Sequence, residues 1–416
     1  MIRMSMQWLA MTRPGYEGDF VRESGGVREG DLGGPGWAVV SYPTPGGRKP
    51  WKDKSPRYFT FARQLFMVFG IISRSDEEDL AARVADAALD WRKTERMAVG
   101  FSSVFVEAPD TEAGRIALTE ARDLQTRVER GLMGLGLMPS DRRGLPRLHV
   151  FLDGAGETLL GVSDPGTSSL WPMGAAMIPL PPEAPSRSAR KLAEALAVFV
   201  PAKEADTRLK PGMKAVDLGA APGGWSWLLA SRGLVVRAVD NGALSDEAFT
   251  LGLVTHIRAD GYTYKPERPV NWLFCDMVGG APRIAKLISN WLARSLFKEA
   301  IFNLKLGDGD RARQLSTARR TLLAAAGRAG LKVELAMRHL YHDRDEVTVH
   351  LRVAAKEEKK KEEEKEKLSP AGKQARVAGK GAVGRKGDAP KPLRKAVKGK
   401  RPSVPRGKTG SGVRKG

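Results

Sequence analysis

The stretch of sequence that decides the fold is Lys214-Ala-Val-Asp-Leu-Gly-Ala-Ala-Pro-Gly-Gly-Trp225. It begins as an apolar run with a carboxylate, Asp217, near its end, continues as a glycine-rich turn, and opens a helical pattern. Gly219, Gly223 and Gly224 allow the backbone to approach a ligand closely, and open α/β sheets bind ligands at the carboxyl ends of their strands. The turn is neither a P-loop, since no Gly-Lys-Ser/Thr follows, nor the Gly-x-Gly-x-x-Gly dinucleotide fingerprint.

The segments around this stretch alternate between short apolar runs and helical patterns, which predicts a parallel sheet buried on both faces. The predicted strands are Lys214–Leu218, Leu234–Asp240, Thr255–Asp260, Asn271–Met277 and Ala300–Leu306. The predicted helices are Ser186–Phe199, Trp225–Arg232, Arg283–Phe297 and Arg311–Arg328. Two last strands, Lys332–Leu340 and Glu346–Val353, are joined by a connection too short for a parallel crossover, so we expect them to be antiparallel. The fold class predicted for residues 176–355 is therefore a Rossmann-like α/β sheet with an antiparallel last strand.

The first half of the chain predicts a smaller α+β region in two parts. Residues 1–57 are rich in Gly and Pro and leave room only for short strands such as Trp37–Tyr42. Residues 58–175 mix strand and helix. The segments expected there are the apolar Phe59–Ile72, a helix at Asp76–Trp91, strands at Ser102–Glu107 and Arg147–Leu152, and mostly helix over Thr111–Leu137.

The charge of the chain points to a polyanionic partner. Lys and Arg number 69 against 48 Asp and Glu in 416 residues, a net charge of +21. Residues 356–416 hold 21 basic and 7 acidic residues and so carry +14, while the rest carries +7. Because this tail has few apolar residues, we expect a charged spacer followed by a disordered basic arm. The arm would add electrostatic affinity for RNA, or it would act only as a solubility tail.

The rest of the composition favours a protein of a reducing compartment that does not span a membrane. Cys275 is the one cysteine, which excludes an intrachain disulfide framework. No apolar stretch reaches the ~18 residues that a membrane span needs, and no secretory signal begins the chain. We expect a cytoplasmic monomer with no membrane partner.

Four acidic residues close successive predicted strands: Asp217, Asp240, Asp260 and Asp276. Each alone could be a cap or turn residue. Together with the glycine-rich turn they predict a cofactor that carries a cation and hydroxyl groups, which fits S-adenosylmethionine. Asp240 would then face the ribose diol, Asp260 the base amino group, and Asp276 the reacting centre.

A second set of residues is suited to proton transfer. Asp276 and Lys305 lie at the ends of neighbouring predicted strands, Lys191 lies on the preceding helix, and Glu346 begins the last strand. A sugar hydroxyl needs a strong base, and Lys305 can serve if the second ammonium of Lys191 lowers its pKa while the two acids fix the geometry. A solvated lysine at a strand end is the alternative interpretation of Lys305.

Other chemistries fit these residues less well. Cytosine-C5 methylation needs a thiolate, but Cys275 directly precedes Asp276 and so points to the opposite face of its strand. Amino-methyltransferases carry Asn/Asp-Pro-Pro-aromatic where this chain has Asp276-Met-Val-Gly-Gly280. His339 and His342 have no cysteine or acidic cluster to complete a zinc site, so we predict no metal and interpret both as packing or RNA-contact residues.

Several motifs occur together in an order typical of one family. They are Ala184-Pro-Ser-Arg-Ser-Ala-Arg-Lys191-Leu, the 215–225 turn, Val239-Asp-Asn-Gly242, Cys275-Asp-Met-Val278, Ile301-Phe-Asn-Leu-Lys-Leu306 and Leu340-Tyr-His-Asp-Arg-Asp-Glu-Val-Thr-Val-His350. Residues 184–353 thus resemble the RlmM-type 23S ribosomal RNA 2′-O-ribose methyltransferases of the FtsJ-like group, which modify a cytidine. The family's turn usually reads Cys-Pro-Gly-Gly, where this chain has Ala221.

The resemblance implies a class I S-adenosylmethionine-dependent fold and a catalytic tetrad of Lys191, Asp276, Lys305 and Glu346, with Lys305 as the proton acceptor. The cofactor residues expected from the turn and the resemblance together are Ser188, Asp217, Gly219, Ala221, Pro222, Gly223, Gly224, Trp225, Asp240, Asp260 and Asp276. The resemblance also implies an amino-terminal RNA-binding THUMP region, of which Arg13-Pro-Gly-Tyr-Glu17 and Phe61-Ala-Arg-Gln-Leu-Phe66 look like remnants. We assign residues 58–175 as its THUMP-like part.

The function predicted is methylation of a cytidine ribose in 23S RNA or a precursor large-subunit particle. Two alternatives remain at this point. The enzyme could modify a uridine or guanosine, as other FtsJ-like enzymes do, or the chain could act chiefly as an RNA-binding ribosome-assembly factor, which the basic tail motivates.

Overall fold

The computed structural model describes residues 6–42, 59–73, 79–94 and 100–354, all within one compact unit, Met1–Lys356. The predicted spacer and basic arm, 356–416, and the whole segment 43–58 lie outside the described residues. Among the helices of the described ranges, none is long and apolar enough to cross a membrane.

The second half of the chain forms a seven-stranded sheet in the order β10-β9-β8-β11-β12-β14-β13. Its strands are β8 (Lys214–Leu218), β9 (Val235–Val239), β10 (Val254–Ile257), β11 (Val270–Cys275), β12 (Phe297–Lys305), β13 (Val333–Arg338) and β14 (Glu346–Val353). The first five in sheet order are parallel, and β14 is antiparallel to both β12 and β13. This confirms the predicted sheet with its antiparallel last strand. The chain reverses its direction of travel across the sheet between β8 and β11, which creates a switch point at the carboxyl ends of these strands.

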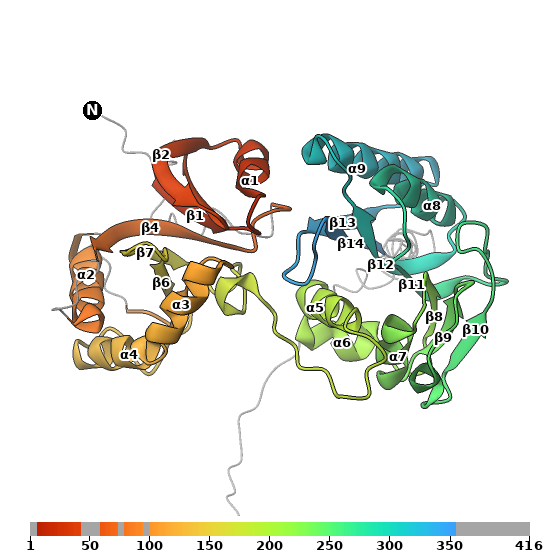
Figure 1. The fold of residues 1–416 in the computed structure, drawn as a ribbon, viewed down its shortest axis with the longest axis horizontal. Helices are drawn as coiled ribbons and strands as arrows, with labels where there is room; N and C mark the ends of the chain where they lie inside the picture. Colours follow the sequence, from red (N-terminus) through yellow and green to blue (C-terminus); the bar gives the residue numbers. More distant parts are fainter. Residues whose placement is uncertain (1–5, 43–58, 74–78, 95–99, 355–416) are drawn as a thin grey trace, which may run out of the picture. The chain divides into compact units, whose positions relative to one another are not determined.

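Helices cover both faces of this sheet. In Figure 1, α8 and α9 lie on one side of β11, β12 and β14, and α5, α6 and α7 lie on the other. These helices are α5 (Ala189–Phe199), α6 (Ala202–Arg208), α7 (Gly224–Ser231), α8 (Ala281–Ala293) and α9 (Arg311–Arg328). Successive residues of β11 enter different clusters: Trp272 and Phe274 pack with α5 and α7, whereas Leu273 and Cys275 pack with α8 and α9. Burial on both faces explains why the predicted strands show no polar alternation.

In this half, one helix ends earlier than predicted, and three short helices were not predicted. The helix predicted to reach Phe297 ends at Ala293, because the chain turns through Ser295 at φ 52° and Phe297 already begins β12. Helix α6 and the short 3₁₀ helices η3 (Pro172–Gly174) and η4 (Asp246–Phe249) were not predicted. Each has seven residues or fewer, so none develops a recognisable amphipathic period.

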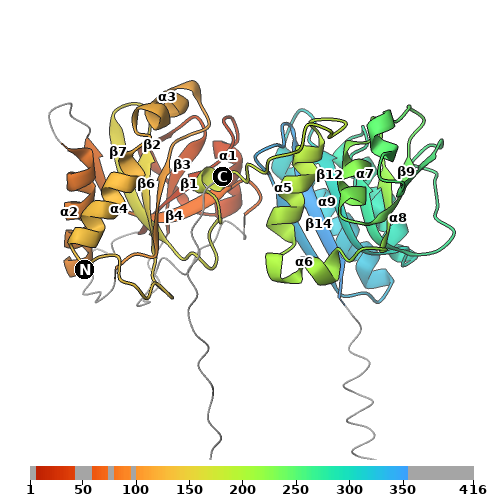
Figure 2. The same cartoon turned by 90° about the horizontal axis from the view of Figure 1, so that it is seen from below.

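The first half of the chain forms a second seven-stranded sheet, in the order β2-β3-β1-β4-β7-β6-β5. Its strands are β1 (Met6–Met11), β2 (Val27–Gly34), β3 (Trp37–Tyr42), β4 (Gln64–Ser73), β5 (Ser103–Glu107), β6 (Arg147–Leu152) and β7 (Glu157–Ser163). Its helices are α1 (Glu17–Ser24), α2 (Leu80–Thr94), α3 (Glu112–Glu120) and α4 (Leu124–Gly134). Helices α2 and α4 lie side by side against the sheet (Figure 2).

Several predictions for this half need correction. Strands β1, β3 and β4 are hydrogen-bonded neighbours, so the division predicted at residue 57 does not separate two sheets. The mostly helical segment predicted over Thr111–Leu137 is two helices, since α3 ends at Glu120 and the chain turns at Ala121–Asp123 before α4 begins at Leu124. Strands β1, β2 and β7 and helix α1 were missed. In β1 and β7 most residues are buried, which removes the alternation that marks a strand.

Candidate active site

Four side chains of the predicted tetrad meet at the carboxyl edge of the second sheet. Lys305 ends β12 and lies directly opposite Glu346, the first residue of the antiparallel β14. Asp276 follows β11, the parallel neighbour of β12. Lys191 lies in the first turn of α5, which packs on this sheet. The structure thus brings together residues that lie up to 155 positions apart in the sequence.

Within the tetrad, each lysine lies close to both carboxylates. The Nζ of Lys305 donates to Asp276 Oδ1 at 3.4 Å and to Glu346 Oε2 at 3.3 Å. The Nζ of Lys191 forms a hydrogen-bonded ion pair with Glu346 Oε1 and lies 3.9 Å from Asp276 Oδ2. The side chain of Lys305 is 35% exposed, whereas that of Glu346 is 5% exposed. Lys305 is therefore the member with most access to a substrate, and Glu346 is the buried anion that holds both lysines.

The pKa of Lys305 differs from the sequence-based prediction. Burial lowers it, but the carboxylates of Asp276 and Glu346 together outweigh burial, so the pKa of Lys305 is raised above its ordinary value. The predicted lowering of the pKa of Lys305 is therefore wrong, and Lys191 is not among the groups that dominate this pKa. The reason is geometric, because Lys191 is itself paired with Glu346.

The glycine-rich turn between β8 and α7 packs closely against its surroundings. Gly219 has φ 79° and Gly223 has φ 112°, a region that favours glycine. A Cβ added to Gly219 would lie 2.8 Å from Met277 Cγ, and one added to Gly223 would lie 2.6 Å from Ala248 Cβ. Ala221 and Pro222 form the outer part of this turn, where Ala221 is partly exposed and Pro222 is exposed. Glycine is therefore required at these two positions for the turn to keep this conformation against Met277 and Ala248.

The strand-end acids lie on the same edge but in different surroundings. Asp240 is half-buried and accepts hydrogen bonds from the amides of Ala221 at 3.1 Å and Gly242 at 2.7 Å. Asp260 is exposed, lies three residues beyond the end of β10, and caps the amide of Tyr262. Asp240 thus fixes the glycine-rich turn and still has carboxylate lone pairs for a ligand.

Two other predicted cofactor residues are buried beneath this edge. Asp217 is 1% exposed, accepts a hydrogen bond from Ser226 Oγ, and keeps its Oδ1 without a partner. Burial raises the pKa of Asp217 to about 7. Trp225 is 3% exposed, and its indole donates to the carbonyl of Ser188 at 3.0 Å, which ties α7 to the start of α5. Both side chains support the turn from below, whereas Ser188 remains half-buried at its surface.

Several residues that organise the site were missed from the sequence. Asn303 donates to Asp276, and Thr348 contacts Asn303. Glu194 is fully buried and accepts hydrogen bonds from the amides of Tyr341 and His342, just before Glu346. The sequence holds one signal for Asn303. It is a polar residue inside an apolar strand, two positions before Lys305 and thus on the same face, and a buried amide needs a partner.

His339 and Cys275 are buried, and His342 is paired with an acid. His339 is 2% exposed, and burial lowers its pKa to about 3, while the Nδ1 of His342 is 2.7 Å from Glu194 Oε2. Burial raises the pKa of the Cys275 thiol to about 12, which leaves it a poor nucleophile. Within residues 6–42, 59–73, 79–94 and 100–354, no three His, Cys, Asp or Glu side chains are placed to hold a metal ion.

The residues quoted as remnants of an RNA-binding region contact the connection between β13 and β14. Arg13 Nη1 donates to the carbonyl of Asp343 at 2.8 Å, and Tyr16 Oη donates to the Asp345 carboxylate at 3.1 Å. Tyr16 is 3% exposed, and burial together with Asp345 raises its pKa to about 12. These two side chains therefore hold the loop that leads into Glu346.

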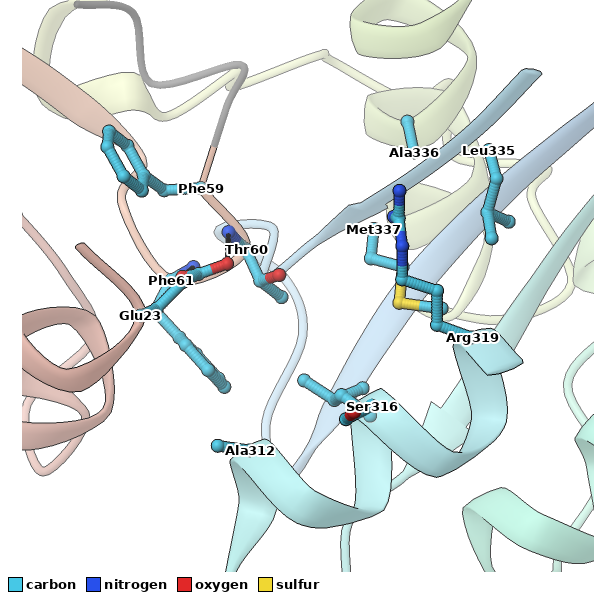
Figure 3. A pocket seen from close by; sticks show the side chains of 11 residues that line it. Glu23, Phe59, Thr60, Phe61, Ala312, Ser316, Arg319, Leu335, Ala336 and Met337 are labelled. Carbon is cyan, nitrogen blue, oxygen red and sulfur yellow. Dashed lines mark hydrogen bonds between the residues drawn. The ribbon is translucent and has the colours of Figure 1, made fainter. Parts of the chain in front are cut away.

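A separate cavity of about 530 Å³ opens beside α9 and β13 (Figure 3). It is lined by Glu23, Phe59, Thr60, Phe61, Ala312, Leu315, Ser316, Arg319, Leu335, Ala336 and Met337. Glu23 is already engaged, since its carboxylate accepts the amide hydrogens of Thr60 and Phe61. None of the tetrad or predicted cofactor residues lines this cavity, so it is distinct from the candidate active site.

The sheet order, the glycine-rich turn after its first strand, and the charged tetrad at its carboxyl edge define a class I methyltransferase. Residues 184–309 match the family model of the FtsJ-like methyltransferases. Ribosomal RNA large subunit methyltransferase M of Laribacter hongkongensis is 38% identical over 84% of this chain and 97% of that relative. The protein of the same name from Azotobacter vinelandii is 43% identical over 60% of this chain and 70% of that relative. The chain belongs to the family of the ribosomal RNA large subunit methyltransferases M.

Proposed function

We propose that this methyltransferase modifies the ribose 2′-hydroxyl of a cytidine in 23S ribosomal RNA, with S-adenosylmethionine as the methyl donor. The observation that carries the proposal is the tetrad, in which a partly exposed lysine is held between two carboxylates at the ligand-binding edge of the sheet. The family relationship and the match to the FtsJ-like model support the RNA substrate and the 2′-O chemistry. A cytoplasmic location follows from this substrate.

The residues around the glycine-rich turn fit the methyl donor. S-adenosylmethionine supplies an electrophilic methyl group on a sulfonium cation, and it carries a ribose diol and an adenine amino group. We propose that Asp240 accepts from the diol, Asp260 from the amino group, and the amides of the turn and Ser188 hold the remainder. Asp217 and Trp225 support the turn from beneath, since both are buried and bonded to its flanking helices.

We propose that Lys305 accepts the proton of the 2′-hydroxyl, which becomes a stronger nucleophile as the proton leaves. Asp276 and Glu346 hold the Nζ of Lys305 in line with the hydroxyl, and Lys191 offsets the charge of Glu346. Because the pKa of Lys305 is raised, only a small neutral fraction acts as the base near neutral pH. The rate should therefore rise with pH until Lys305 is deprotonated.

Asp240→Ala should weaken binding of S-adenosylmethionine by about 10-fold to 100-fold, because a hydrogen bond to a carboxylate contributes ~1.5–3 kcal/mol. Isothermal titration calorimetry measures the dissociation constant directly. Asp246→Ala is the matched control, since Asp246 is an exposed acid in the following 3₁₀ helix and should leave binding unchanged. An unchanged dissociation constant in Asp240→Ala would remove Asp240 from the cofactor site.

The proposed function is tested by incubating the purified chain with methyl-labelled S-adenosylmethionine and 23S RNA that lacks the modification. Label in the ribose of one cytidine is expected, and mass spectrometry of nuclease fragments identifies the nucleotide. Label in a base, or label in a uridine or guanosine ribose, would contradict the proposal in its chemistry or in its target. Comparing free 23S RNA with precursor large-subunit particles shows which of the two is the substrate.

A further inference from the structure

A chain of buried polar side chains leads from the tetrad into the protein interior. Asn303 on β12 donates through Nδ2 to Asp276 Oδ1 at 3.0 Å. Thr348, the cross-strand partner of Asn303 on β14, lies with its Oγ1 2.9 Å from Asn303 Oδ1. The same Oγ1 is 3.0 Å from Oδ1 and 2.9 Å from Oδ2 of Asp343. Asn303 and Asp343 are fully buried, and Thr348 is 1% exposed.

The donor and acceptor in each of these hydrogen bonds follow from the number of hydrogens that each side chain can donate. Asp276 contacts Lys305 and lies near Lys191, so it is a carboxylate and can only accept from the Asn303 amide. The single hydroxyl hydrogen of Thr348 has two acceptors within reach, Asn303 Oδ1 and the Asp343 carboxyl group. We assign it to Asn303, because giving it to Asp343 would leave the Asn303 carbonyl oxygen and Thr348 Oγ1 facing each other as two acceptors. With that hydrogen used, Thr348 Oγ1 can only accept from Asp343, which requires a proton on the Asp343 carboxyl group.

The surroundings of Asp343 favour such a proton. Its Oδ2 accepts from the amides of Leu340 at 2.9 Å and Thr348 at 3.2 Å, which leaves Oδ1 free to carry the hydrogen. Burial, together with the neighbouring acids Glu346 and Glu194, raises the pKa of Asp343 to about 7, although the hydrogen bonds with the Leu340 amide and with Thr348 act in the opposite direction. No solvent reaches the group, so the hydrogen has Thr348 Oγ1 as its acceptor.

We propose that Asp343, Thr348 and Asn303 form a relay of hydrogen bonds that positions the Asp276 carboxylate against Lys305. The hydrogens run from Asp343 to Thr348, from Thr348 to Asn303, and from Asn303 to Asp276. None of the three touches the reacting atoms, so they are positioning residues. The inference rests on the proposed function, because it gives Asp276 its part in holding the base.

Thr348→Val tests the relay, since valine keeps the shape of threonine and removes the hydroxyl. We expect kcat for RNA methylation to fall about 10-fold while KM for RNA and for S-adenosylmethionine stays within about 2-fold, because one buried hydrogen bond to the positioning chain is lost. Thr348→Ser restores the hydroxyl and should restore kcat. Asp343→Asn retains an N–H donor toward Thr348, so it should lose less activity than Thr348→Val.

A crystal structure of Thr348→Val gives a readout that does not depend on turnover. The relay predicts that the Asn303 amide turns and that the Asp276 carboxylate moves away from Lys305. An Asp276 that stays in place, or a Thr348→Ser variant as slow as Thr348→Val, would overturn the relay. A wild-type protein that leaves RNA unmethylated would instead contradict the proposed function, and the crystal structure would still decide the relay.

Discussion

Lys305→Ala should lower methylation of 23S RNA by about 10³-fold while binding of S-adenosylmethionine stays unchanged. The substitution removes the proposed proton acceptor, and general base catalysis contributes about 10²- to 10⁴-fold to a rate. The cofactor contacts proposed for Ser188, Asp240 and Asp260 do not involve Lys305, whose Nζ contacts Asp276 and Glu346. Single-turnover assays with saturating RNA measure the rate, and calorimetry measures the cofactor affinity.

Lys298→Ala is the matched control for this experiment. Lys298 lies on the same strand, β12, but is exposed at its opposite end. It should methylate at the wild-type rate, and both variants should keep the wild-type unfolding midpoint. Full activity in Lys305→Ala would assign the proton transfer to another group or to solvent, and Lys305 would then be the solvated strand-end lysine of the alternative interpretation.

The edge of the sheet that binds ligands could be predicted from the sequence because its signals are local. Asp240 and Asp276 each follow an apolar run directly, and in the structure each follows the last residue of a parallel strand. The short connection before Glu346 was enough to predict the antiparallel pairing of β14. In such cases the residue that matters and the pattern that reveals it lie within a few positions of each other.

The electrostatics of the tetrad could not be predicted in this way. The pKa of Lys305 depends on which partner each lysine contacts, and Lys191 contacts Glu346 across 155 positions of sequence. The role of Asn303 likewise depends on the register between β12 and β14, which places it opposite Thr348. Trp225 is a further example. Its place next to the glycine-rich turn predicted a cofactor contact, but its side chain points into the core and donates to the carbonyl of Ser188.

Glu346→Gln should lower the maximal rate of methylation and at the same time shift its pH dependence to lower pH. Glu346 is one of the two carboxylates that raise the pKa of Lys305, so its neutralisation lowers that pKa. The maximal rate should fall about 10²-fold, because Nζ of Lys305 and Nζ of Lys191 lose the carboxylate that positions both.

The sign of the pH shift separates this role of Glu346 from a purely structural one. Below the pKa of Lys305 the neutral fraction grows about tenfold per pH unit, so the wild-type rate should still be rising near about pH 10, while the variant should level off earlier. Glu334→Gln removes an exposed acid from β13 and should retain the wild-type profile. A Glu346→Gln profile that is lower but unshifted would mean that Glu346 only supports the fold. A shift to lower pH requires that the charge of Glu346 acts on Lys305, because a purely structural role would leave the pKa of Lys305 unchanged.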